Sequence, residues 1–191
     1  MRLILLGPPG AGKGTQSEAI SATFGIPHIS TGDIFRANVA GETPLGKEAQ
    51  GYMSRGELVP DELVNRMVAD RLRQDDAETG FLLDGYPRTV GQAFTLAGMV
   101  AMLDASIDAV LHFKVDLEEL ESRIAKRQEE EGRDDDSAEV FERRMREYRD
   151  QTTDLIPHYA GIGLLVDIDA VGTIEEVRER VLAACREAAD E

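Results

Sequence analysis

A glycine-rich run that contains a lysine has the composition of a phosphate-binding loop. The run GPPGAGKGT, residues 7–15, follows an apolar stretch and precedes a helical pattern. Its glycines let backbone N–H groups turn inward, the start of the helix adds partial positive charge, and Lys13 supplies a full charge for the β- and γ-phosphates. The run therefore predicts nucleotide binding by Gly10, Ala11, Gly12, Lys13, Gly14 and Thr15. The alternative, a turn without a ligand, leaves Lys13 with no role.

The loop departs from the general pattern at one position. Gly14 stands directly after the lysine, where the pattern has Ser or Thr, and Thr15 follows it. The usual hydroxyl ligand of Mg²⁺ is therefore absent or displaced by one residue.

A carboxylate and an arginine follow a second apolar run. Residues 81–83 are apolar and end in Asp84, which places a carboxylate at the carboxyl edge of a parallel sheet, beside the phosphate loop. Such a group orients Mg²⁺ through water, because this ion keeps much of its hydration; capping of the next turn is the alternative. The Tyr86-Pro87 bend then aims Arg88 at the same site, where its planar guanidinium can bridge phosphate oxygens.

The remaining reactive residues form no further constellation. His28, His112 and His158 are scattered without catalytic or metal-ligand spacing, so we expect them to be structural. The single Cys185 cannot form an internal disulfide or a multi-cysteine metal site. This favours a reducing, cytoplasmic location.

Short apolar runs alternate with longer stretches of 3.6-residue period, which predicts βαβ units. The predicted strands are 2–6, 27–29, 81–84, 109–115 and 164–168, and the predicted helices are 14–24, 31–40, 45–54, 61–73, 89–103, 117–128, 138–152 and 173–188. Five strands with crossover helices predict an α/β, doubly wound, right-handed fold with a parallel sheet flanked by helices.

Two segments interrupt the strict alternation. Residues 31–61 hold two or three helices between consecutive strands, which predicts a helical insertion. Residues 128–136, QEEEGRDDD, are almost entirely charged and lie between two helical patterns. Their simplest interpretation is a solvated loop.

Length and charge limit the possible functions. The 191 residues, 42% of them hydrophobic, fit a single domain spanning 1–191. Lys and Arg number 21 against 37 Asp and Glu, a net charge of −16, so duplex nucleic acid and anionic membranes are not expected partners. We see no signal-peptide pattern and no apolar run of about 18 residues that would span a bilayer. The acidity also suggests a protein adapted to high salt, where screening relieves self-repulsion.

Four motifs in order resemble the adenylate kinase family. They are GPPGAGKGT at 7–15, STGD at 30–33 with Arg36, GELVPD at 56–61, and FLLDGYPR at 81–88 with Gln92. The resemblance runs along nearly the whole chain. It implies a P-loop NTPase fold with a helical AMP-binding insertion at 30–59 and a short lid loop at 128–136.

The resemblance implies a set of contacts for AMP. Thr31 would contact the adenine, Arg36 would hold the phosphate, and residues 57–59 would meet the base mainly through their backbone. A helix cap at Thr31 and a solvated Arg36 are the alternatives. The full implied AMP set is Thr31, Arg36, Glu57, Leu58, Val59, Gly85, Tyr86, Pro87, Arg88, Gln92, Arg133 and Arg144.

The resemblance also implies residues on the ATP side. Arg127 would meet ATP, with Arg123, one helical turn earlier, competing for that role, and the backbone at Gly172 would meet the ATP adenine. Arg133 and Arg144 would close over the phosphates, although an Arg among Asp residues is commonly only a surface ion pair.

The implied reaction is reversible, Mg²⁺-dependent phosphoryl transfer from ATP to AMP, giving two ADP. Its catalytic residues would be Lys13, Asp84, Arg88, Arg133 and Arg144, and Mg²⁺ would be held by nucleotide and water near Asp84, not by the protein directly. No structural zinc is expected, because residues 128–136 contain no cysteine. ATP, AMP and ADP are the expected partners of a monomer.

Two alternatives remain. One is another nucleoside monophosphate kinase, acting on UMP or CMP; Thr31 together with Gln92 favours AMP. The other is a P-loop nucleotide-binding switch module that hydrolyses slowly.

Overall fold

The computed structural model describes residues 1–131 and 137–190. Its centre is a five-stranded parallel sheet in the order β2-β3-β1-β4-β5. The strands are β1 (Arg2–Leu6), β2 (His28–Ser30), β3 (Phe81–Asp84), β4 (Ala109–Lys114) and β5 (Leu165–Asp169). The predicted parallel α/β fold is therefore confirmed, with β2 and β5 each displaced by one residue from the predicted range.

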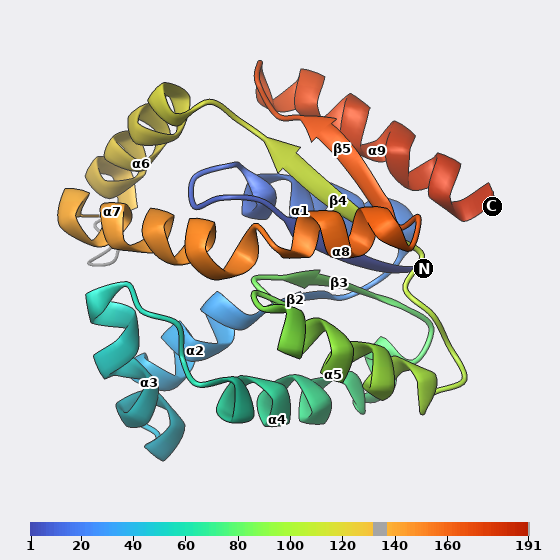
Figure 1. Ribbon diagram of the computed structural model, residues 1–191, viewed down its shortest axis with the longest axis horizontal. Helices are drawn as coiled ribbons and strands as arrows, with labels where there is room; N and C mark the ends of the chain where they lie inside the picture. Colours follow the sequence, from blue (N-terminus) through green and yellow to red (C-terminus); the bar gives the residue numbers. More distant parts are fainter. Residues whose placement is uncertain (132–136, 191) are drawn as a thin grey trace.

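Helices cover both faces of this sheet (Figure 1). They are α1 (Lys13–Phe24), α2 (Thr31–Ala40), α3 (Pro44–Arg55), α4 (Asp61–Leu72), α5 (Val90–Ala101), α6 (Leu117–Glu131), α7 (Ala138–Glu147), α8 (Leu155–Gly161) and α9 (Ile174–Asp190). Short helical turns occupy η1 (Asp75–Ala77) and η3 (Tyr148–Thr152), the latter a π-helical turn. Helices α1 and α9 lie on one face, and α4, α5 and α8 lie on the other.

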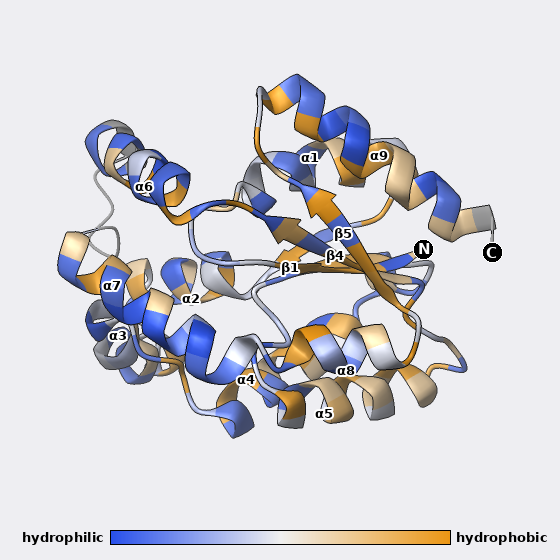
Figure 2. Ribbon diagram, turned by 45° about the horizontal axis from the view of Figure 1, so that its top comes forward, coloured by the Kyte–Doolittle hydropathy of each residue, from blue (hydrophilic) through white to orange (hydrophobic). Residues whose placement is uncertain are grey.

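The buried side chains of β1 alternate between two apolar clusters. Leu3 and Leu5 belong to the cluster under α1 and α9, whereas Ile4 and Leu6 belong to the cluster under α4, α5 and α8. A strand covered on both faces needs apolar residues at every position, which explains the uninterrupted apolar runs in the sequence. Figure 2 shows hydrophobic colour concentrated on the sheet and mixed colours on the surrounding helices.

The insertion between β2 and β3 is helical, as the sequence predicted. Its helices α2 and α3 pack against each other and lie beside α4 at one end of the molecule (Figure 1). Ser30, not Thr31, caps α2: its hydroxyl accepts a hydrogen bond from the Asp33 N–H at 3.2 Å. Thr31 is the first helical residue, so its side chain remains available for other contacts.

Two helical predictions differ from the structure. Helix α6 continues to Glu131, three residues beyond the predicted helix 117–128, so residues 129–131 of the expected loop are helical. Positions 132–136 of the expected lid lie outside the described residues. Helix α8 was missed because its seven residues are too few to show a clear 3.6-residue period. No helix in the described part of the chain has the length and apolar character needed to cross a membrane.

Candidate nucleotide-binding and active site

The phosphate loop joins the carboxyl end of β1 to the start of α1. Gly12 takes the N-cap position of α1 with φ 88°, a left-handed conformation that glycine adopts without the steric cost of a Cβ atom. The first backbone N–H groups of α1 lack carbonyl partners within the helix, and the helix dipole is positive at this end. The loop therefore has the geometry of an anion-binding site.

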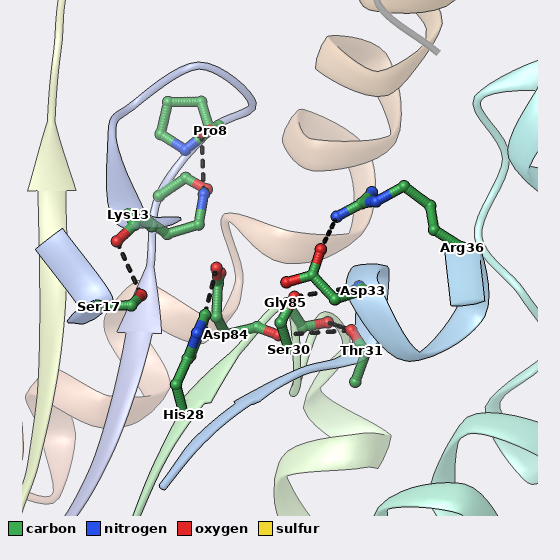
Figure 3. A network of polar contacts seen from close by, with 11 residues as sticks. Pro8, Lys13, Ser17, His28, Ser30, Thr31, Asp33, Arg36, Asp84 and Gly85 are labelled. Atoms are coloured by element: carbon green, nitrogen blue, oxygen red, sulfur yellow. Dashed lines mark hydrogen bonds and ion pairs between the residues drawn. The ribbon is translucent and has the colours of Figure 1, made fainter. Parts of the chain in front are cut away.

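Lys13 folds back over its own loop. Its Nζ donates to the carbonyl oxygens of Gly7 at 2.8 Å and Pro8 at 3.0 Å, as Figure 3 shows in part. The Ser17 hydroxyl donates to the Lys13 carbonyl at 2.9 Å and so reinforces the first turn of α1. The ammonium charge is thus held at the mouth of the loop, within the larger of the two cavities described below.

Asp84 ends β3 beside the loop, as predicted. The register pairs it with Leu5 of β1 on one side and Ser30 of β2 on the other. Burial by itself raises the pKa of Asp84, but the adjacent His28 and the positive charges of Lys13 and Arg88 outweigh that effect. The net pKa lies below its usual range, so Asp84 is ionised near neutral pH.

Sequence reasoning missed the position of His28. We expected a structural histidine, yet its Nε2 lies 3.7 Å from Oδ2 of Asp84, and His28 lines the larger cavity (Figure 3). The signal was not visible in the sequence, because only the sheet order makes β2 and β3 neighbours.

A sharp turn after β3 links Thr31 to Arg88. Gly85 has φ 81°, and a Cβ atom there would lie 2.7 Å from Oγ1 of Thr31. The Gly85 carbonyl accepts hydrogen bonds from the Thr31 hydroxyl at 3.0 Å and from Nε of Arg88 at 2.9 Å. The turn therefore fixes both side chains from one backbone oxygen.

A cavity between the insertion and the sheet collects most of the residues expected to bind AMP. Its lining includes Thr31, Arg36, Glu57, Leu58, Val59, Gly85, Arg88, Gln92 and Arg144. Glu57 directs its carboxylate to Arg55, at 2.7 and 2.9 Å, so this side chain is already engaged in an ion pair. Arg36 pairs with Asp33 one turn earlier in α2 (Figure 3).

Tyr86 and Pro87 are placed differently from the other expected AMP residues. Both are buried, and neither lines a described cavity. The Tyr86 hydroxyl donates to Oδ1 of Asn65 at 2.6 Å, and burial together with the charge of Asp61 raises its pKa, which keeps this donor protonated. These two residues form the bend that positions Gly85 and Arg88.

A larger cavity of about 960 Å³ opens over the phosphate loop. Residues 9–16, Asp84, Arg88, Arg123, Arg144, Gly172 and Thr173 are among its lining residues. Arg123 donates to the carbonyl of Ala170 at 2.9 Å and to Glu119 at 2.7 Å, so it joins α6 to the loop after β5. The side chain of Arg127 and the whole of Arg133 lie outside the described residues. Of Arg123 and Arg127, the two candidates for contacting ATP, the structure therefore describes only the side chain of Arg123.

The donor set near the loop fits Mg²⁺ held through water and phosphate. Asp84 supplies one ionised carboxylate, and its Oδ2 lies 4.0 Å from where a Cβ atom would stand on Gly14. Among the side chains that the structure describes, no group of three or more His, Cys, Asp or Glu is arranged to hold a metal ion. A single hard oxygen ligand suits an ion that retains most of its water.

The parallel sheet, the phosphate loop and the adjoining carboxylate define a P-loop phosphotransferase. A family model described as "Adenylate kinase" matches residues 5–164. Curated relatives named "Adenylate kinase" include one from Thermobifida fusca (strain YX), 54% identical over 186 residues, covering 97% of this chain and 98% of the relative. Another, from Nocardia farcinica (strain IFM 10152), is 51% identical over 184 residues, covering 96% and 98% of the two chains. The chain belongs to the adenylate kinase family.

Proposed function

We propose that this adenylate kinase binds ATP in the larger cavity, with its phosphates on residues 10–15, and AMP in the cavity between the insertion and the sheet. The observation that carries the proposal is that Arg36, Arg88 and Arg144 line both cavities. Guanidinium groups bind phosphate oxygens through paired hydrogen bonds. Three arginines that line both cavities could therefore bind the donor and acceptor phosphates where these meet.

The chemistry requires positioning and charge neutralisation more than proton transfer. Phosphoryl transfer spreads negative charge over the oxygens of the transferred group, and the acceptor phosphate is already largely ionised near pH 7. Lys13 neutralises the β- and γ-phosphates, and Arg88, held by Gly85, bridges donor and acceptor. Mg²⁺, when bound near Asp84, would add a Lewis-acidic charge at the phosphates.

Thr31 supports a base that carries an exocyclic amine. The Thr31 hydroxyl donates its one proton to the Gly85 carbonyl at 3.0 Å, so toward a ligand its oxygen can only accept a hydrogen bond. Adenine presents an amine donor at N6, whereas uracil and guanine present a carbonyl oxygen at the corresponding edge. This polarity favours AMP over UMP and GMP.

Closure over the substrates completes the proposal. Water must be excluded during transfer, because water would otherwise accept the phosphoryl group. The end of α3 already approaches α7: a Cβ atom on Gly56 would stand 2.9 Å from the Val140 carbonyl oxygen. We propose that the insertion and the 128–136 segment close together over the substrates. On closure, Arg127, Arg133 and Arg144 contact the phosphates, and the backbone at Gly172 contacts the ATP adenine. We also propose that the protein is a cytoplasmic monomer without structural zinc.

The test is a substrate screen with purified protein. Mg²⁺ and ATP are combined in turn with AMP, GMP, CMP and UMP, and the nucleoside diphosphates are followed by chromatography. We expect ADP to form from AMP and little diphosphate to form from the other acceptors. A different preferred acceptor would overturn the substrate assignment, and steady phosphate release without any acceptor would indicate a nucleotide-hydrolysing switch.

A further inference from the structure

A buried hydrogen-bond network lies behind the cavity that we assign to AMP. Gln92, 2% exposed, lines that cavity from the first turn of α5. Its Oε1 accepts from the backbone N–H of Arg88 at 2.7 Å, and its Nε2 donates to Oδ1 of Asp61 at 2.6 Å. Both ends of the amide are therefore anchored by the protein.

The partners fix which way the amide points. A carboxylate oxygen accepts hydrogen bonds, so the amide nitrogen of Gln92 must face Asp61. A backbone N–H only donates, so the amide oxygen must face Arg88. If the amide were turned over, its NH₂ group would face the Arg88 N–H, donor against donor, and its oxygen would face the Asp61 carboxylate, acceptor against acceptor. Both hydrogen bonds would then be lost.

Asp61 is itself held in place. It is the first residue of α4, and its second oxygen, Oδ2, accepts from the Thr89 hydroxyl at 2.9 Å. Thr89 is the N-cap of α5 and accepts from the Gln92 N–H at 3.1 Å. The carboxylate thus lies between the starts of two helices, where their dipoles favour a negative charge.

We propose that Asp61 is a positioning residue that sets base selection by fixing the orientation of the Gln92 amide. The Gln92 nitrogen uses one of its two N–H donors on Asp61, and the oxygen uses one of its two lone pairs on the Arg88 N–H. One N–H donor and one oxygen lone pair therefore remain for a ligand. That pair complements an edge with an acceptor next to an amine donor, the pattern of adenine at N1 and N6. Hypoxanthine has nearly the same shape but presents the reverse pattern, an N–H donor next to a carbonyl oxygen. This inference rests on the proposed AMP site.

The experiment compares AMP with inosine monophosphate as acceptor for the wild type and for variants of Asp61. In Asp61→Ala, one anchor of the amide is lost, so we expect kcat/KM for AMP to fall about tenfold and the AMP-to-IMP preference to fall by at least as much. The loss should appear mainly in KM for the acceptor, with kcat at saturating AMP within about threefold of wild type, because Asp61 is not among the residues that line either cavity.

A conservative variant tests orientation against charge. In Asp61→Asn, Oδ1 can still accept from Gln92 while the new amide donates to Thr89 Oγ1, so we expect the AMP preference to be largely restored. Asp61→Ser supplies a hydroxyl that both donates and accepts; it should behave like Asp61→Ala, and it serves as the second variant if the alanine form does not fold. Asp70→Ala removes a surface carboxylate of the same helix, paired with Arg73, and should leave the preference unchanged.

The outcomes separate this inference from the proposed function. A wild-type protein that makes no ADP from AMP would overturn the proposed function and this inference with it. An active wild type whose AMP-to-IMP preference survives in both Asp61→Ala and Asp61→Ser would overturn the positioning role alone. Equal loss of preference in Asp61→Asn and Asp61→Ala would also overturn it, because charge and not amide orientation would then matter.

Discussion

Nζ of Lys13 donates a hydrogen bond to the carbonyl oxygen of Gly7 at 2.8 Å, across the phosphate loop that both residues belong to. The lysine therefore closes the loop on itself while its charge stays at the loop mouth. This arrangement gives one residue two effects, on the shape of the loop and on the nucleotide charge.

Replacing Lys13 should therefore weaken catalysis more than folding. We expect Lys13→Ala to lower kcat/KM for ATP by about 100-fold or more, because a positioned charge on the transferring phosphates is lost. Steady-state kinetics with ATP varied at saturating AMP measures this. Lys47→Ala, which removes an exposed lysine of α3 that lines neither cavity, is the matched control; a tenfold or smaller effect of Lys13→Ala would contradict the assigned role.

Replacing Asp84 should lower activity by a factor that does not depend on pH. Burial raises the pKa of Asp84, but His28, Lys13 and Arg88 bring it below its usual range, so the group stays ionised from about pH 5 to 9. We expect Asp84→Asn to reduce kcat about 100-fold at pH 5.5 and pH 8 alike. A ratio of wild-type to variant rates that grows steadily with pH would show that this carboxyl titrates in the working range.

The same lowered pKa has a consequence for stability. Because the folded-state pKa of Asp84 lies below that of the unfolded chain, ionised Asp84 stabilises the fold above the unfolded-state pKa. That contribution is lost as pH falls through the folded-state value. The difference in free energy of unfolding between wild type and Asp84→Asn, measured by urea denaturation, should be constant near neutral pH and shrink only in acid.

Arg88 should matter for turnover and little for folding. We expect Arg88→Ala to lower kcat by about 1000-fold or more, since a bridging arginine in phosphoryl transfer contributes on that scale. Arg88→Lys should recover only part of this, because an ammonium group lacks the two-pronged geometry of guanidinium. Thermal melting checks the fold, Arg73→Ala at the surface is the control, and near-normal turnover of Arg88→Ala would refute the assignment.

Gly85 should not tolerate a side chain. A left-handed φ of 81° costs about 1–2 kcal/mol for a residue with a Cβ atom, and that atom would also stand 2.7 Å from Oγ1 of Thr31. We expect Gly85→Ala to be destabilised by at least this amount and to show a raised KM for AMP. Gly98→Ala in α5, where a Cβ atom meets no neighbour within 4 Å, should instead stabilise by about 0.5–1 kcal/mol. Urea unfolding compares the two, and equal stabilities would contradict the expected strain.

Salt should stabilise the fold if its net charge of −16 produces strong self-repulsion. The Debye length falls to about 3 Å at 1 M salt, which screens charges across the surface. We expect the melting temperature to rise between low salt and molar KCl, measured by circular dichroism. Sucrose of equal osmolality controls for solute exclusion, and an unchanged melting temperature in KCl would end the high-salt hypothesis.

The sequence by itself determined the parts of this protein that depend on local pattern. The loop at 7–15, the strand ending in Asp84 and the bend before Arg88 are contiguous in the chain, and periodicity alone marked the parallel sheet. The motifs also assigned residues to an expected ATP site and an expected AMP site. The sequence did not predict the short helix α8 or the exact end of α6, because a few residues are too short a segment to show a clear period.

Only the tertiary structure decided which distant residues meet. The sheet order makes β2 the neighbour of β3, which brings His28 to Asp84. The packing of α4 beside α5 brings Asp61 to Gln92, 31 positions later in the chain. No local sequence pattern encodes such contacts. They depend on the order in which the strands pair and on which helix faces pack together, and both are set only when the whole core forms.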